Sequence, residues 1–419
     1  MKHSTFLATA LGFFFSLSVA ASSYNEVQLT FTRTGTAVNT VTVSVADENG
    51  TAIDGVTAEL VSLKKTGEAD CTLMPNSTAQ YKPGVDNSSL APAYDNRQNG
   101  YMTFLFKITG LSDFMWNKCT IGVLPVSSSG QKQSSAANPR KFTFDVNCGS
   151  ESTSLSPVAT LANENIVTQF DADNSAVWHD ISLNGTKTTA TAEMYLQVKI
   201  TKNDSQGCFV AINKIKLSKV TYPVTLAETT KIGNAATFSA EEATTVPDGV
   251  NIYKVVTSAD NTTATLTQVE GNVIPARQGV ILLSSTTASA NLYATTAGNT
   301  SDFSDNELIA IPGGGTPTAE GKTLYVFTKN TEGAALFKLL DTANGEFAAN
   351  KACLGISASG EAPATIRMSL DNNLTGIGTV ANEKPAVGNN TLYDLTGRRV
   401  TTPAKGQICI SSGRKILVK

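Results

Sequence analysis

Alternation of apolar and polar side chains is the feature that most limits the folds open to this chain. Residues 27–32 read Val-Gln-Leu-Thr-Phe-Thr, and residues 40–45 read Thr-Val-Thr-Val-Ser-Val. The runs at 101–108 and 141–146 repeat this pattern. A period of two is typical of a strand with one buried face, and β-branched residues pack well on a pleated sheet. No helical pattern extends beyond about ten residues, so the sequence predicts an all-β fold.

Composition excludes two classes of protein. The 419 residues are 41% hydrophobic and only 16% charged, with a formal net charge of −3. The hydrophobic fraction is enough for packed cores, which excludes wholesale disorder. Without a basic excess to neutralise phosphates, nucleic acid is excluded as a partner. Outward-facing Thr and Ser would keep the sheets soluble with few charges.

The first 20 residues have the pattern of a secretory signal peptide. A short positive start is followed by an uncharged apolar run at 6–19, which ends in the small residues Ser18-Val19-Ala20. The run is too short for a membrane span, which needs about 20 residues. No later stretch reaches that length, so we expect no transmembrane segment. The mature protein is expected to be secreted or held at the outer cell surface.

Turn residues divide the mature chain into parts. Many short strands at near-regular spacing favour sandwiches or barrels, so we expect tandem β-sandwich-like domains with a short C-terminal β tail. The first domain is either one elaborated sandwich or two subdomains split near residue 150, and we expect residues 218–223 to link it to the second. The predicted parts are a first β-sandwich unit at 24–219, a second β module at 220–375, a Gly- and Pro-containing linker at 376–389 and a β tail at 390–419.

The tail resembles a known sorting segment. Residues 393–398 read Tyr-Asp-Leu-Thr-Gly-Arg, a Lys405-Gly406 turn follows, and residues 414–419 read Arg-Lys-Ile-Leu-Val-Lys. This pattern is similar to the type A sorting domain of the Bacteroidetes type IX secretion system, although Cys409 stands where that family usually has an aromatic residue. The resemblance implies export and sorting through the tail.

The two larger units also resemble parts of Bacteroidetes secreted proteins. Residues 236–239, 265–269 and 279–282 resemble a β-module common in those proteins. Residues 29–36 look like the start of an N-terminal β-domain found beside such modules. Neither resemblance implies a catalytic activity.

Catalytic signals are scarce. Once the leader is removed, His179 is the one histidine left, which argues against a His-rich metal site. No nucleophile elbow, zinc-protease helix or phosphate-binding glycine loop appears. We therefore expect no enzyme. The competing hypothesis is a hydrolase with paired carboxylates drawn from Asp171, Asp173 and Asp180, which lie close in sequence.

A calcium loop is a second hypothesis for the same stretch. Asp171, Asp173 and Ser175 offer oxygen ligands at alternate positions. Ala176 stands where such loops need glycine, and Ser182 where they need the closing glutamate. These departures favour a plain polar turn. A structural Ca²⁺ ion is the alternative, and no other cofactor is expected.

The two tryptophans are candidates for ligand contact. Trp178 precedes His179, and Trp116 stands alone. Exposed aromatic rings with polar neighbours can stack on sugars, which points to glycans or glycoproteins as partners. The alternative is that both are core residues, because tryptophan is highly buried on average.

The cysteines and one threonine complete the candidates. Six cysteines without a CxxC pair disfavour a zinc site, which leaves disulfides of an exported protein or buried thiols. Thr342, in Asp341-Thr342-Ala343, resembles the O-glycosylation site of Bacteroidetes exported proteins. A plain surface turn is the alternative there.

Together these signals favour a non-catalytic binding or scaffold protein that recognises glycans or glycoproteins. The alternatives are a carboxylate-dependent hydrolase and a purely structural surface protein. A deep pocket with convergent carboxylates would favour the hydrolase, and an exposed aromatic platform would favour binding.

Overall fold

Strands β1 to β31 make up nearly all of the regular structure in the described chain, with one short 3-10 turn, η1 (Val38–Thr40). The predicted all-β fold class is confirmed. No helix in this part of the chain is long and apolar enough to cross a membrane. The computed structural model describes residues 24–74, 87–92, 99–111, 113–126, 139–167, 169–170, 176–204, 209–298, 301–317, 321–340, 345–357, 362–371, 392–393, 399–400, 408–411 and 414–417.

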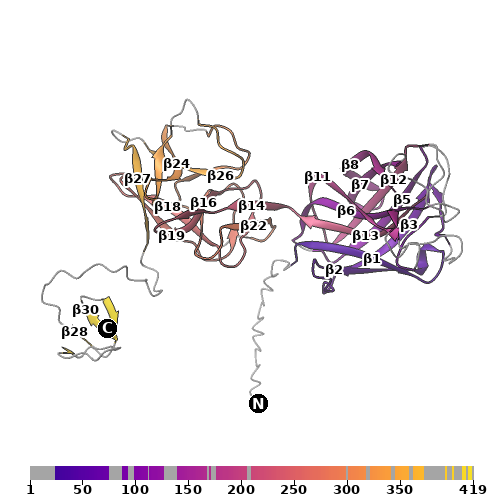
Figure 1. The fold of residues 1–419 in the computed structure, drawn as a ribbon, viewed down its shortest axis with the longest axis horizontal. Helices are drawn as coiled ribbons and strands as arrows, with labels where there is room; N and C mark the ends of the chain where they lie inside the picture. The colour runs from indigo at the N-terminus through magenta and orange to yellow at the C-terminus, as the bar shows by residue number, and fades with distance from the viewer. Residues whose placement is uncertain are drawn as a thin grey trace, which may run out of the picture. The chain divides into compact units, whose positions relative to one another are not determined.

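All but two of the strands up to residue 219 share one sheet, and we call this part of the chain the first module (Figure 1). Its order is β11-β6-β13-β1-β2-β3-β5-β12-β7-β8, with β4 paired to β3, while β9 and β10 pair separately. The strands are β1 (Glu26–Arg33), β2 (Val41–Ala46), β3 (Thr57–Lys65), β4 (Ala69–Asp70), β5 (Tyr101–Thr109), β6 (Met115–Val126), β7 (Arg140–Glu151), β8 (Ser154–Ile166), β9 (Gln169–Phe170), β10 (Ala176–Val177), β11 (His179–Thr189), β12 (Glu193–Lys202) and β13 (Phe209–Lys219).

This sheet folds back on itself as a sandwich. Strands β2 and β3 pair at a single position, Val43 with Ala58, so the sheet is weakest there. Across the interior, the rings of Phe31 on β1 and Phe106 on β5 stack with their centroids 5.6 Å apart. The predicted strand runs at 27–32, 101–108 and 141–146 fall in β1, β5 and β7, which confirms them. The run at 40–45 falls in β2 except for its first residue, which ends η1.

The part from Val220 to Leu370, which we call the second module, has two sheets. A ten-stranded sheet runs β15-β16-β21-β18-β19-β27-β25-β24-β26-β23, and a smaller one runs β14-β22-β17-β20. The strands are β14 (Thr221–Thr225), β15 (Ala227–Thr229), β16 (Gly233–Phe238), β17 (Thr244–Thr245), β18 (Asn251–Thr257), β19 (Thr263–Gln268), β20 (Val273–Ile274), β21 (Val280–Ser284), β22 (Ser289–Ala294), β23 (Leu308–Ile311), β24 (Lys322–Lys329), β25 (Ala335–Leu339), β26 (Lys351–Ser357) and β27 (Thr365–Leu370).

The large sheet of the second module has a core on each face. One face curls around Ile281, Tyr325 and Phe337. The other face carries Phe238 and Leu282, which pack against the small sheet. The central strand β21 is buried along its whole length, since alternate residues serve the two cores.

The two modules are joined by strand rather than by the linker expected at 218–223. Ser218 and Lys219 end β13, and β14 begins at Thr221. Between them, the Val220 amide donates to the Met115 carbonyl at 2.8 Å, while the Val220 carbonyl accepts from Ala294 at 3.0 Å. Val220 is therefore hydrogen-bonded to both modules.

The chain divides into two compact units, Met1–Leu370 and Asp371–Lys419. In the second unit a small sheet runs β29-β28-β30-β31. Its strands are β28 (Leu392–Tyr393), β29 (Arg399–Val400), β30 (Ile408–Ser411) and β31 (Arg414–Leu417).

Candidate functional site

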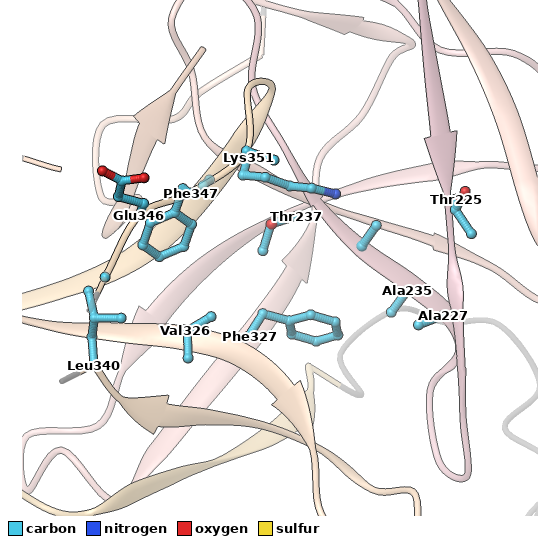
Figure 2. A pocket seen from close by; sticks show the side chains of 14 residues that line it. Thr225, Ala227, Ala235, Thr237, Val326, Phe327, Leu340, Glu346, Phe347 and Lys351 are labelled. Atoms are coloured by element: carbon cyan, nitrogen blue, oxygen red, sulfur yellow. The ribbon is translucent and has the colours of Figure 1, made fainter. Parts of the chain in front are cut away.

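A pocket of about 350 Å³ opens in the second module, where β16 approaches β24 and β26 (Figure 2). Its walls combine aliphatic and aromatic side chains with one lysine. The lining residues are Thr225, Ala227, Ala235, Ala236, Thr237, Val326, Phe327, Leu340, Gly345, Glu346, Phe347, Ala348, Lys351 and Ala352.

A buried serine fixes the backbone at the edge of this pocket. The Ser239 hydroxyl, which follows β16, donates to the Lys351 carbonyl at 2.6 Å and accepts from the Ile311 amide at 3.0 Å. Asn350 has a φ of 62° and donates from its side chain to the Ser239 carbonyl at 3.1 Å. These bonds tie β16 to β23 and β26, and they set the point from which the Lys351 side chain leaves the sheet.

Lys351 is the cation of the pocket. Its side chain is half-buried, and it extends above Thr237 with its ammonium pointing away from the Glu346 carboxylate (Figure 2). Among the described residues, Lys351 takes part in no ion pair. An unpaired ammonium beside apolar walls attracts an anion more strongly than a fully solvated lysine does, because water screens it less.

The pocket combines apolar walls with a few polar groups. Phe327, Val326 and Leu340 offer apolar contact, and Thr237 offers a hydroxyl. Glu346 is the one carboxylate among the described lining residues, and no histidine or cysteine joins it. A general acid–base pair is therefore missing from these residues, whereas an apolar wall with a few polar groups is typical of binding sites.

Trp116 is corrected from a candidate ligand contact to a core residue. Its side chain has no exposed surface, and it packs in the interior of the first module. A ring without exposed surface cannot stack on a sugar from solvent.

Trp178 and His179 lie elsewhere on the same module. Trp178 is half-buried, and Nε2 of His179 lies 2.7 Å from the Val167 carbonyl oxygen. His179 pairs with Val123 on β6, whereas Trp116 lies seven residues earlier on that strand. At about 3.3 Å per residue the two sites are some 20 Å apart, so the structure does not bring the tryptophans together.

The remaining predicted ligands lie outside the described residues. These are Asp171, Asp173 and Ser175 of the calcium hypothesis and Thr342 of the glycosylation hypothesis. Asp180 is described, and its carboxylate pairs with Lys214 at 2.9 Å. Within the described ranges, no group of three or more His, Cys, Asp or Glu side chains could hold a metal ion.

Four of the described cysteines, Cys71, Cys119, Cys148 and Cys353, are buried and form no disulfide with one another. Burial raises the pKa of Cys119 to about 12, and of Cys148 and Cys353 to about 11. A thiol with so high a pKa is protonated at neutral pH and is a poor nucleophile.

A second hollow bears on the hydrolase hypothesis. It has a volume of about 490 Å³, and Glu270 and Asp302 both line it. The Ser304 amide donates to Asp302 at 2.9 Å, and this bond lowers the pKa of the carboxyl. Asp302 therefore stays ionised at neutral pH, which suits a proton donor poorly.

No protein-family model matches the chain, and a search of curated proteins finds no significant match. Sequence reasoning also missed the pocket, because its lining comes from segments around residues 225–237, 326–340 and 345–352 that share no motif.

Proposed function

We propose that this chain is an exported, non-catalytic binding protein, and that the pocket of the second module holds its ligand. The observation that carries the proposal is Lys351, a cation without an ion-pair partner among the described residues, beside apolar walls. Such a site combines non-directional apolar contact with one charged contact that sets orientation.

The ligand class that fits best is a sugar with an acidic group. The C–H face of a sugar ring can pack on the ring of Phe327, because aromatic side chains combine an apolar surface with a polarised edge. Its carboxylate or sulfate would pair with Lys351, and its hydroxyls would hydrogen-bond to Thr237. This proposal keeps the predicted glycan partner but moves the contact from the tryptophans to the second module.

A glycan-binding screen of the mature full-length protein tests the proposal. We expect binding to acidic glycans and weaker binding to their neutral counterparts. Lys351→Met keeps the length of the side chain but removes its charge, and it should weaken binding at least tenfold, or about 1.4 kcal/mol. Lys338→Met is the matched control, since Lys338 is exposed on β25 and does not line the pocket. Absence of acidic-glycan binding, or equal binding by both variants, would overturn the proposal.

Export through the type IX system is the second part of the proposal. It rests on the leader at residues 1–20 and on the resemblance of residues 390–419 to a type A sorting domain. In a host with that system, deletion of residues 390–419 should leave the protein inside the cell envelope. Surface proteolysis of intact cells checks this, and a truncated protein that still reaches the surface would contradict it.

A further inference from the structure

The junction between the modules carries two carboxylates that link them. Glu242, in the second module, lies 2.5 Å from the ammonium of Lys187 on β11 of the first module. The hydroxyl of Tyr222 on β14 also donates to Glu242, and it lies 3.3 Å from the same ammonium. The ammonium stands 5.7 Å from the centre of the Tyr222 ring. The three side chains thus form a closed cluster across the junction.

The second carboxylate belongs to the first module. Asp113 accepts from the hydroxyl of Thr295 at 2.7 Å and from the hydroxyl of Thr296 at 2.8 Å. The backbone amide of Thr296 donates to it as well. Asp113 has a φ of 49°, a conformation that Asp adopts more readily than most residues. A carboxylate with three donors from one short segment holds that segment in one orientation.

Apolar contact and backbone bonds surround these two clusters. Met115 of the first module packs against the core of the second. Val220 bonds to Met115 and to Ala294, as described above. The polar clusters therefore flank a strand that is hydrogen-bonded on both sides, and little freedom remains for rotation about it.

We infer that the two modules form one rigid unit, clamped by Asp113 and Glu242, and that acid releases the Glu242 contact and lets the modules move. The inference goes beyond ligand binding, because it concerns the junction and not the pocket.

The direction of the pH dependence follows from Glu242. Burial acts to raise its pKa, but hydrogen bonds from Lys187 and Tyr222 outweigh burial and hold the pKa below its ordinary value. Because the pKa is lower in the folded protein, the ionised Glu242 stabilises the junction at pH values above its unfolded pKa of about 4.3. This stabilisation is lost as the pH falls through the folded-state pKa. Lys187, Tyr222 and the neighbouring Glu241 are the charged or titratable groups around it.

Asp113 has its own charged surroundings. Lys219 lies near it, and the charge of Glu48 also acts on Lys219. The Lys219 ammonium stands 5.9 Å from the ring of Tyr24 and 5.8 Å from that of Phe114. Burial lowers the pKa of Lys219, while Asp113 and Glu48 act in the opposite direction. Lys219 remains charged in acid, so acid acts on the junction through Glu242.

Distance measurements between spin labels test the inference in the full mature chain. One label replaces Asn165 on β8 and the other Lys329 on β24, both exposed, through unnatural amino acids that leave the cysteines untouched. A control pair at Asn291 and Lys329 lies within the second module. We expect a narrow distance distribution for the first pair at pH 7 and at least a twofold broader one near pH 3.5, while the control pair stays narrow.

Variants separate the clamp from general acid effects. Glu242→Gln combined with Lys187→Met should broaden the distance distribution of the first label pair at least twofold at pH 7, where the modules remain folded. Glu241→Gln is the matched control, since Glu241 pairs with Arg277 instead, and it should leave the width unchanged. A broad distribution in the wild type at pH 7, or a width that neither the double variant nor acid changes, would overturn the inference.

Discussion

The ammonium of Lys187 lies 2.5 Å from the carboxylate of Glu242, although the two residues belong to different modules. Exposed ion pairs contribute only about 0–1 kcal/mol to stability, and the Lys187 side chain is 40% exposed. The contact therefore acts mainly by orienting the two modules, because Tyr222 donates to the same carboxylate and fixes its geometry.

Removing the phenol of Tyr325 should stabilise the second module. The side chain is fully buried, and its hydroxyl has no hydrogen-bond partner within the described part of the chain. A buried polar group without a partner costs about 1–3 kcal/mol, so Tyr325→Phe should raise the unfolding free energy by about 1 kcal/mol. Urea unfolding followed by circular dichroism measures this. Tyr253→Phe is the control, because the Tyr253 hydroxyl bonds to Gln268 at 3.4 Å and its loss should give no gain.

The buried thiols should resist alkylation in the folded protein. A thiol pKa of about 12 at Cys119 reduces the thiolate fraction at pH 8 by about 1,000-fold relative to an ordinary cysteine. Peptide mass spectrometry after iodoacetamide treatment should find Cys119, Cys148 and Cys353 unmodified until urea is added. Rapid labelling of Cys119 in native buffer would contradict this account of its burial.

Asp260 should make the thermal stability of the second module depend on pH in the acid range. Its carboxylate accepts from the Ser258 hydroxyl at 2.6 Å and from the Thr262 hydroxyl at 2.9 Å, in the turn between β18 and β19. These bonds, with the one from Ser258 foremost, lower its pKa. Its stabilising effect is therefore present above the unfolded value and is lost as the pH falls. Asp260→Asn should lower the melting temperature at pH 7 but not at pH 2.5, and a difference that persists in acid would refute this.

Gly185 should tolerate no side chain. A Cβ at this position would stand 2.1 Å from the carbonyl oxygen of Val158, because β11 passes close to β8 there. Gly185→Ala should destabilise the first module by about 1–3 kcal/mol, as overpacking commonly does. Both tryptophans lie in that module, so their fluorescence during urea unfolding reports on it directly. Gly50→Ala is a comparison variant in the same module. Nothing lies within 4 Å of a Cβ there, so any cost comes from its φ of 79°, a strain that Gly185 does not have.

Local pattern was enough to predict the strands. In β1 the residues Val27, Leu29 and Phe31 are buried, as a period of two requires. Because this alternation involves only neighbouring residues, it predicts a strand without any knowledge of which strands pair.

Register was not readable in the same way. On β6, Cys119 and Ile121 face the core, yet Trp116 is also buried. The pairing of β13 with β6 shifts between Lys118 and Trp116, so residues before the shift change faces. No pattern in the sequence marks that bulge. The pocket could not be predicted for a related reason. Ser239 and Lys351 are 112 residues apart in the sequence and meet only because the sheet curls.

The register of β1 and β13 has one further consequence. Glu26 lies opposite Ser218, so the chain enters the first module and leaves it at neighbouring positions. A load applied between these two points would open the ladder one residue pair at a time, beginning at Glu26. The first module would therefore yield to tension at these two points by unzipping, and not by shearing of its strands.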